Sequence, residues 1–161
     1  MNETQRTLTV IVTVCAGLSA GVFFAFSTFV MPALDRLRAP EAIRAMQELN
    51  RAAPNAAFMT VLFAPLVPMG WLLLKVARRG GPSAPYLVAG TACFAVGLLI
   101  LIAYHVPHND ALAKVSPASP SAASTWRDYY RGWTWWNHAR TATFTAATAL
   151  FALAARAART E

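Results

Sequence analysis

The chain has 161 residues, of which 57% are hydrophobic and only 13% are charged, and its formal net charge is +7. Soluble proteins contain roughly 45–50% apolar and about 25% charged residues, so this composition excludes a water-soluble globule, a disordered chain and a cysteine-rich disulfide scaffold. No Lys and Arg cluster lies on a soluble module that could follow phosphates, so we expect no nucleic-acid partner. A protein that crosses the lipid bilayer several times remains.

Four stretches meet or approach the length of about 20 apolar residues that a transmembrane helix needs. The sequence therefore predicts an all-α fold, a four-transmembrane-helix bundle, in a single domain over residues 1–161. The spans are expected at about residues 8–34, 54–76, 85–105 and 135–155, with a loop over residues 106–134.

A short interfacial helix is predicted between the first two spans. Pro40 suits a helix start, and Ile43, Met46 and Leu49 follow it at helical spacing. Within the spans, Gly17 and Gly21 predict close helix contacts, either inside one chain or in a homo-oligomer.

Prolines predict irregular spans. Pro65 and Pro68 are expected to kink the second span, and Pro107 to end or kink the third at His105, turning that imidazole toward the polar residues of the same face.

The connection after the second span gives the expected orientation. Lys75, Arg78 and Arg79 lie close to two spans with no acidic residue among them, where the positive-inside bias acts most strongly. We expect a multi-pass protein of the plasma (cytoplasmic) membrane with both termini cytoplasmic.

Polar residues concentrate in two short segments that alternating topology places at one membrane face. These are residues 105–110 and 133–140, and Asn50 and Asn55 flank the entry to the second span at the same face. Because an unpaired polar group in hydrocarbon costs several kcal/mol, we expect these residues to form a polar pocket at one mouth of the bundle.

Arg140 has two interpretations. It could pair with Asp110 or with carbonyls at a span end and so have a structural role, or it could recognise an anion or oxyanion. The aromatic residues around the start of the fourth span also have two: an aromatic belt at the headgroup level, or a stacking wall for a flat aromatic ligand. They are Trp126, Tyr129, Tyr130, Trp133, Trp135 and Trp136.

Four segments resemble the anthrone oxygenase family of small integral membrane proteins, and the resemblance extends over nearly the whole chain. They are residues 21–34, 46–55, 106–112 (VPHNDAL) and 133–141 (WTWWNHART). The resemblance implies four membrane helices and, for members with a known role, oxidation of a polyketide anthrone to an anthraquinone by O₂.

A deprotonated anthrone can react with O₂ without a metal, so the mechanism expected here uses no cofactor. His105 or His138 would act as base, and Arg140, Asn109 and Asn137 would stabilise the enolate and peroxide. The other expected substrate-binding residues are the ring walls Trp133 and Trp136, with Asn50, Asn55 and Asp110.

Two other functions stay open. His105, His108, Asp110 and His138 could hold the metal of a metal-dependent oxygenase. The protein could instead be non-catalytic and bind a lipid, a quinone or a partner protein. An open cavity favours an enzyme, and a filled, fully paired polar network favours a structural role.

Overall fold

The computed structural model describes residues 2–157, and within them it contains helices and connections but no strand, so the all-α prediction is confirmed. Two of the helical segments, η1 and η2, are π-helical. The elements are α1 (Glu3–Ala25), η1 (Phe26–Val30), α2 (Met31–Asp35), α3 (Ala39–Ala52), α4 (Ala56–Phe63), α5 (Leu66–Arg79), α6 (Ala84–Ile100), η2 (Leu101–His105), α7 (Val106–Ala113) and α8 (Ala122–Ala157).

Three helical runs within residues 2–157 are long and apolar enough to cross a membrane: Glu3–Asp35, Ala56–Arg79 and Ala84–Ala113. They contain nearly all of the first three predicted spans. The fourth predicted span, 135–155, lies inside α8, which is not among these runs because polar residues such as Asn137 and Arg140 lower its mean hydropathy.

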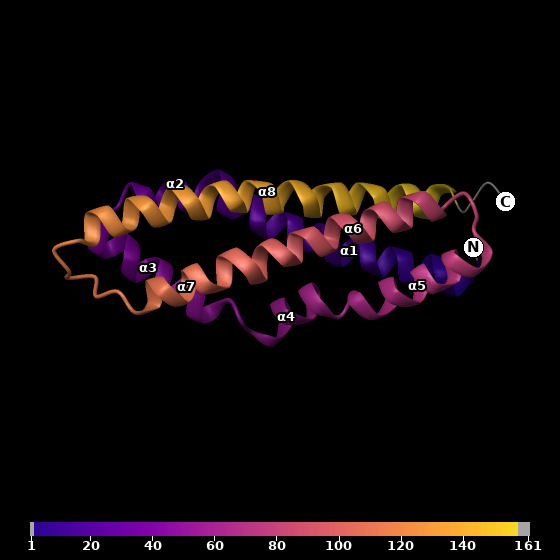
Figure 1. Ribbon diagram of the computed structural model, residues 1–161, viewed down its shortest axis with the longest axis horizontal. Helices are drawn as coiled ribbons and strands as arrows, with labels where there is room; N and C mark the ends of the chain where they lie inside the picture. The colour runs from indigo at the N-terminus through magenta and orange to yellow at the C-terminus, as the bar shows by residue number, and fades with distance from the viewer. Residues whose placement is uncertain (1, 158–161) are drawn as a thin grey trace.

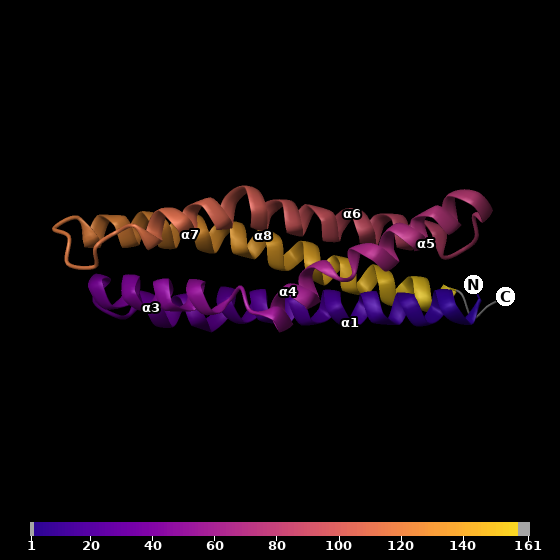
Figure 2. The same cartoon turned by 90° about the horizontal axis from the view of Figure 1, so that it is seen from below.

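The long helices lie side by side along one axis. α8 extends along the molecule and packs against both α1 and α6 (Figure 1). α4 and α5 cover one half of the molecule and α3 covers the other (Figure 2). The beginning of α1, the α5–α6 connection and the end of α8 all lie at the same end of the structure (Figure 1).

Both π-helical segments come shortly before a proline, Pro32 after η1 and Pro107 after η2. At each junction a backbone N–H donates to the carbonyl five residues back, as Val106 does to Leu101. In an α-helix the proline ring collides with the carbonyl four residues back, and the wider π turn relieves that collision. The helix therefore continues past Pro107 to Ala113, and the prediction of a loop over 106–134 is wrong: the connection is only residues 114–121.

The two other predicted irregularities are present. The second long run is divided into α4 and α5 at Ala64 and Pro65, as the prolines indicated. The helix predicted after Pro40 is α3, and it is fastened to α7 because Gln47 Nε2 donates to the carbonyls of Leu112 and Val115, both at 2.9 Å.

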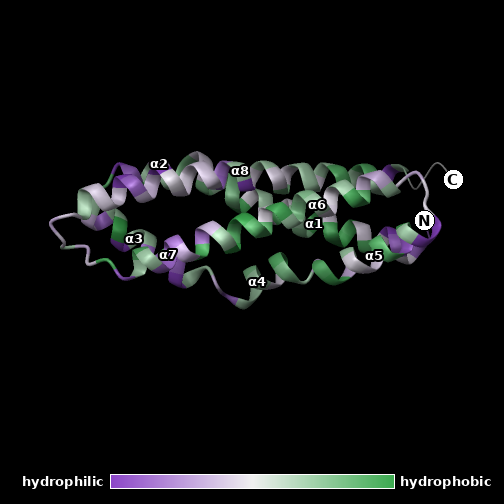
Figure 3. Cartoon of the chain, in the orientation of Figure 1, coloured by the Kyte–Doolittle hydropathy of each residue, from purple (hydrophilic) through white to green (hydrophobic). Residues whose placement is uncertain are grey.

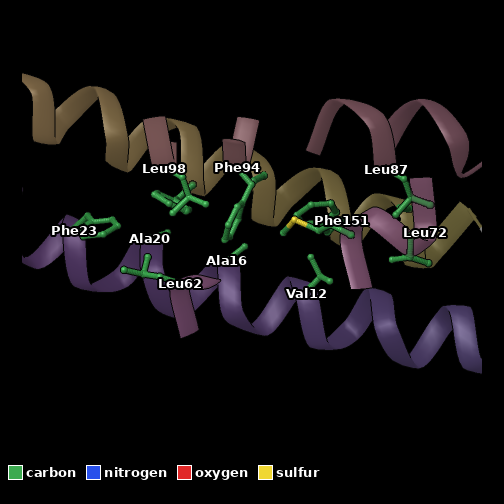
Figure 4. Close-up of a cluster of buried hydrophobic side chains, with 14 residues drawn as sticks. Val12, Ala16, Ala20, Phe23, Leu62, Leu72, Leu87, Phe94, Leu98 and Phe151 are labelled. Carbon is green, nitrogen blue, oxygen red and sulfur yellow. The ribbon is translucent and has the colours of Figure 1, made fainter. Parts of the chain in front are cut away.

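Two apolar clusters form the core. The first joins α1, α6 and α8 through side chains such as Val12, Phe94 and Phe151 (Figure 4). The second cluster joins α2, α3, α7 and the first part of α8, and it includes Met31 and Ile43. Hydrophilic residues mark both ends of the molecule, while the central parts of α1, α5 and α6 are mostly hydrophobic (Figure 3).

The aromatic residues of α8 divide between these environments. Trp126, Tyr129 and Trp133 are buried in the second cluster, so the aromatic-belt prediction is wrong for these three. Trp135 and Trp136 are exposed. The difference follows from helical periodicity, because only residues that recur every three or four positions face the second cluster, which α2, α3 and α7 complete.

Two glycines of α6 lie in close contact with aromatic rings of α8. A Cβ at Gly97 would lie 2.6 Å from the Phe144 ring, and one at Gly90 would lie 2.8 Å from the Phe151 ring. A Cβ at Gly21 would meet nothing within 4 Å, so this glycine makes no close contact inside one chain, and Gly17 has only ordinary contact with Thr148. The alternative of a contact between two chains stays a prediction.

Replacing Gly97 with Ala should lower the free energy of unfolding by about 1–3 kcal/mol relative to Gly21→Ala, because overpacking a closed contact forces neighbours to move. Both changes add the same methyl group to a helix, so their difference isolates the packing cost. Reversible unfolding in mixed micelles, followed by circular dichroism, measures it. Equal stability of the two variants would contradict the packing described at Gly97.

Candidate functional site

A cavity of about 370 Å³ lies near the middle of the molecule, between α1, the α3–α4 connection, α7 and α8. We call it the central cavity. Its volume falls within the roughly 300–1,000 Å³ typical of small-molecule sites. Four polar residues, Asn50, Asn55, Asn109 and Arg140, line it, and the rest of the wall is apolar: Val22, Phe23, Phe26, Leu49, Ala52, Ala53, Phe58, Leu101 and Trp133.

Arg140 contributes a buried positive charge to this wall. Its side chain is only 3% exposed, and its guanidinium carbon lies 3.8 Å from the centre of the Phe23 ring. Nη2 donates to Asn137 Oδ1 at 2.5 Å, while the buried Nε has no hydrogen-bond partner. Within residues 2–157 no carboxylate forms an ion pair with this guanidinium.

The predicted pairing of Arg140 with Asp110 is therefore wrong. Asp110 is exposed on α7, whereas the preceding residue, Asn109, faces α8. Neighbouring residues on a helix point about 100° apart, so both cannot face the same partner helix. Arg140 also donates to no span-end carbonyl among the described residues.

Asn137, which is buried next to the cavity wall, fixes the orientation of Arg140. Its Nδ2 donates to the Phe23 carbonyl at 2.8 Å and to Ser27 Oγ at 2.7 Å, which ties α8 to α1 and η1. Its Oδ1 is thereby left to accept the Arg140 bond. Asn137 is completely buried and does not itself line the cavity.

Asn109 fixes the orientation of Trp133 in the cavity wall. Its Oδ1 accepts from Tyr129 Oη at 2.8 Å and from Trp133 Nε1 at 3.0 Å, so the Trp133 ring is held in place beside the cavity. The Asn109 amide nitrogen has no partner among the described residues, and neither has the buried Nδ2 of Asn50. Two amide donors thus remain available alongside Arg140.

The predicted bases do not line the central cavity. His105 is fully buried, with its ring nitrogens 3.3 Å from the carbonyl oxygens of Ile100 and Trp133. His108 and His138 are exposed. No group of three or more His, Cys, Asp or Glu side chains within residues 2–157 could hold a metal ion, so the ligand set suggested for a metal oxygenase is not assembled.

The structure thus brings only part of the predicted site together. Asn50, Asn55, Asn109, Trp133 and Arg140 meet at the cavity. Asp110, Trp136 and His138 lie outside it because each faces solvent or lipid. Sequence reasoning missed the walls Phe23, Phe26 and Phe58 and the supporting residues Ser27 and Tyr129; the spacing of Tyr129 and Trp133 by four residues was the available signal.

The sequence model of a family described as Anthrone oxygenase matches residues 44–150, which include most of α3, all of α7 and the α8 residues of the cavity. No curated protein and no solved structure matches the chain.

Because Arg140 has no anionic partner among residues 2–157, replacing it with Met should lower the free energy of unfolding by only about 1–3 kcal/mol, the penalty for leaving the buried Asn137 Oδ1 without its donor. Breaking a buried ion pair costs about 3–5 kcal/mol instead. Asn137→Leu is the contrasting variant, since it leaves the Arg140 donor and Ser27 unpaired, and it should be strongly destabilised. Unfolding in mixed micelles measures both; a loss above about 3 kcal/mol in Arg140→Met would favour a structural ion pair.

Proposed function

The chain belongs to the anthrone oxygenase family, and we propose that it is a membrane oxygenase whose central cavity binds a flat phenolic or enolic aromatic compound as its anion for reaction with O₂. The buried guanidinium of Arg140, which has no ion-pair partner among residues 2–157 and lies on a largely apolar wall, is the observation that carries this proposal. The family match supports the oxygenase class, and the cavity supports an aromatic ligand.

We place the protein in the plasma membrane as a single domain with four crossings, α8 being the fourth. Between Arg131 and Arg156, α8 has 24 residues, and Arg140 is the one charged side chain among them. At 1.5 Å per residue this segment is about 36 Å long, enough for a hydrocarbon core of roughly 30 Å. Arg140 faces inward, as a charge inside a bundle must. We propose that the end bearing Lys75 and its neighbouring arginines is cytoplasmic.

Binding and orientation follow from the wall chemistry. A guanidinium removed from water attracts an anion far more strongly than one in solution, because the effective dielectric constant around it is low. Trp133 and Phe23 contribute aromatic surface to the wall, against which a planar ring system can pack. The amide nitrogens of Asn50 and Asn109 add donors for further oxygens on the ligand.

The proposed reaction balances without any further reactant. Loss of one proton from the methylene carbon of an anthrone gives an enolate, whose oxygen Arg140 stabilises. That carbon donates an electron pair to O₂, forming a C–O bond and, with one proton, a hydroperoxide. Loss of the second C–H proton breaks the O–O bond, releasing water and leaving the quinone carbonyl.

The protons in this scheme pass to water, because neither His105 nor His138 lines the cavity. Arg140 is the one titratable side chain in its wall. A cavity wall without a histidine base also favours a second candidate function, a protein that binds a quinone or quinol and performs no chemistry. Binding and turnover must therefore be measured separately.

Purified protein should consume O₂ when an anthrone is added, and Arg140→Gln should reduce this rate by about 10²–10³-fold, the usual loss for one oxyanion donor. Arg131→Gln, an exposed charge change on the same helix, should stay within twofold of the parent. Oxygen-electrode rates and quenching of tryptophan fluorescence separate turnover from binding. Quenching without O₂ uptake would support the binding protein, and equal loss in both variants would contradict the role of Arg140.

His138→Asn should leave anthrone-dependent O₂ uptake within twofold of the parent, since His138 is exposed. His105→Asn should lower activity and folded yield together, because the imidazole is buried among backbone carbonyls. Activity per folded molecule, measured after size-exclusion chromatography, is the decisive quantity. A tenfold loss per folded molecule in either variant would restore a histidine as base.

A further inference from the structure

A second cavity of about 250 Å³ lies at the end of the molecule where the chain begins, between the first turn of α1, the last turns of α5 and the start of α6. We call it the end cavity. It is separate from the central cavity and shares no residue with it. Hydrophilic residues cluster visibly at this end of α5 (Figure 3). The wall consists of Asn2, Gln5, Leu72, Lys75, Val76, Arg79, Gly80, Gly81, Pro82, Ser83 and Leu87.

The charged groups of this wall are both cations. Lys75 and Arg79 stand four residues apart on α5, so they lie on the same face of the helix. Lys75 Nζ lies 5.0 Å from the centre of the Trp71 ring, and Arg79 has no partner among residues 2–157. No carboxylate of the described residues lines the cavity. The end cavity is therefore suited to an anion.

Ser83 supplies further hydrogen-bond donors to the end cavity. The residue is only 5% exposed, yet its hydroxyl caps no amide of α6 and has no hydrogen-bond partner among the described residues. Its own backbone N–H and that of Gly81 also lack protein acceptors. The Ser83 hydroxyl and these two N–H groups are therefore free donors at the end cavity, and a polar ligand in the cavity can accept from them.

The remaining polar side chains also present donors. The carboxamide oxygens of Asn2 and Gln5 are used in a reciprocal capping box at the start of α1. Their amide nitrogens have no partner among the described residues. The wall thus offers hydroxyl, amide, ammonium and guanidinium donors to a single space, which is the chemistry that binds a phosphate group.

The position of the end cavity identifies the source of the phosphate. It lies at the ends of all three long apolar runs of residues 2–157, where headgroups would surround the protein. Leu74, next to Lys75 on α5, is exposed and would lie beside the acyl chains of a lipid whose headgroup entered the cavity. We propose that the end cavity binds the phosphate of an anionic phospholipid headgroup.

The test measures how tightly phosphatidylglycerol and phosphatidylcholine bind to the detergent-solubilised protein and to its charge variants. Phosphatidylglycerol should bind at least tenfold more tightly than phosphatidylcholine, as measured by native mass spectrometry and by the shift of the unfolding temperature. Lys75→Gln with Arg79→Gln should abolish this preference. Arg78→Gln, which removes a neighbouring charge that does not line the cavity, should keep it within twofold.

Ser83→Ala distinguishes a built site from general attraction to a basic surface. Because this hydroxyl makes no bond in the free protein, its removal should leave the stability of lipid-free protein unchanged while weakening phosphatidylglycerol binding several-fold. Equal weakening by Arg78→Gln and by the Lys75 and Arg79 changes would overturn the proposal. So would inorganic phosphate that stabilises the protein as much as the lipid does, since the source would then be soluble phosphate.

Discussion

The hydrogen bonds of Asn137 determine how the middle of this molecule is arranged. Through Nδ2 the side chain joins α8 to the Phe23 carbonyl and to the Ser27 hydroxyl, and through Oδ1 it holds Arg140. Because a buried amide must satisfy both ends at once, its position fixes the relation of α8 to α1. This bond holds the Arg140 guanidinium at the cavity wall, away from exposed carboxylates such as that of Asp110.

Ser27, Asn137 and Arg140 lie between the two apolar clusters, and each cluster packs against one side of this group. Phe144 packs against Phe23 in the first cluster, and Trp133 belongs to the second. The π-helical segments flank the same level, with Ser27 in η1 and His105 in η2 both contacting α8. Proline positions thus shape the backbone at the depth where the cavity forms. Such coupling of helix irregularity and site is common, because π turns re-aim side chains.

Much of the fold could be predicted from the sequence, because hydrophobic length and proline chemistry act locally. The first three apolar runs, α3 and the break at Pro65 follow from such local rules. The continuation through Pro107 could not be predicted, since it depends on a π turn held against α8. The meeting of Asn50, Asn109 and Arg140 followed from alternating topology. The sequence does not predict which side of each helix faces inward, because packing sets the rotation of the helix about its axis. Asp110 and His138 face outward, and Phe23 faces inward.

The central claim is that Arg140 supplies an unpaired positive charge that converts an apolar cavity into a site for an aromatic anion. Binding of a monohydroxyanthraquinone, followed by its visible absorption, tests this most directly. At a pH where the free compound is neutral, the bound compound should show the spectrum of its phenolate, and Arg140→Met should return it to the neutral spectrum. A bound compound that stays neutral in the parent protein, or ionises equally in both proteins, would contradict the account.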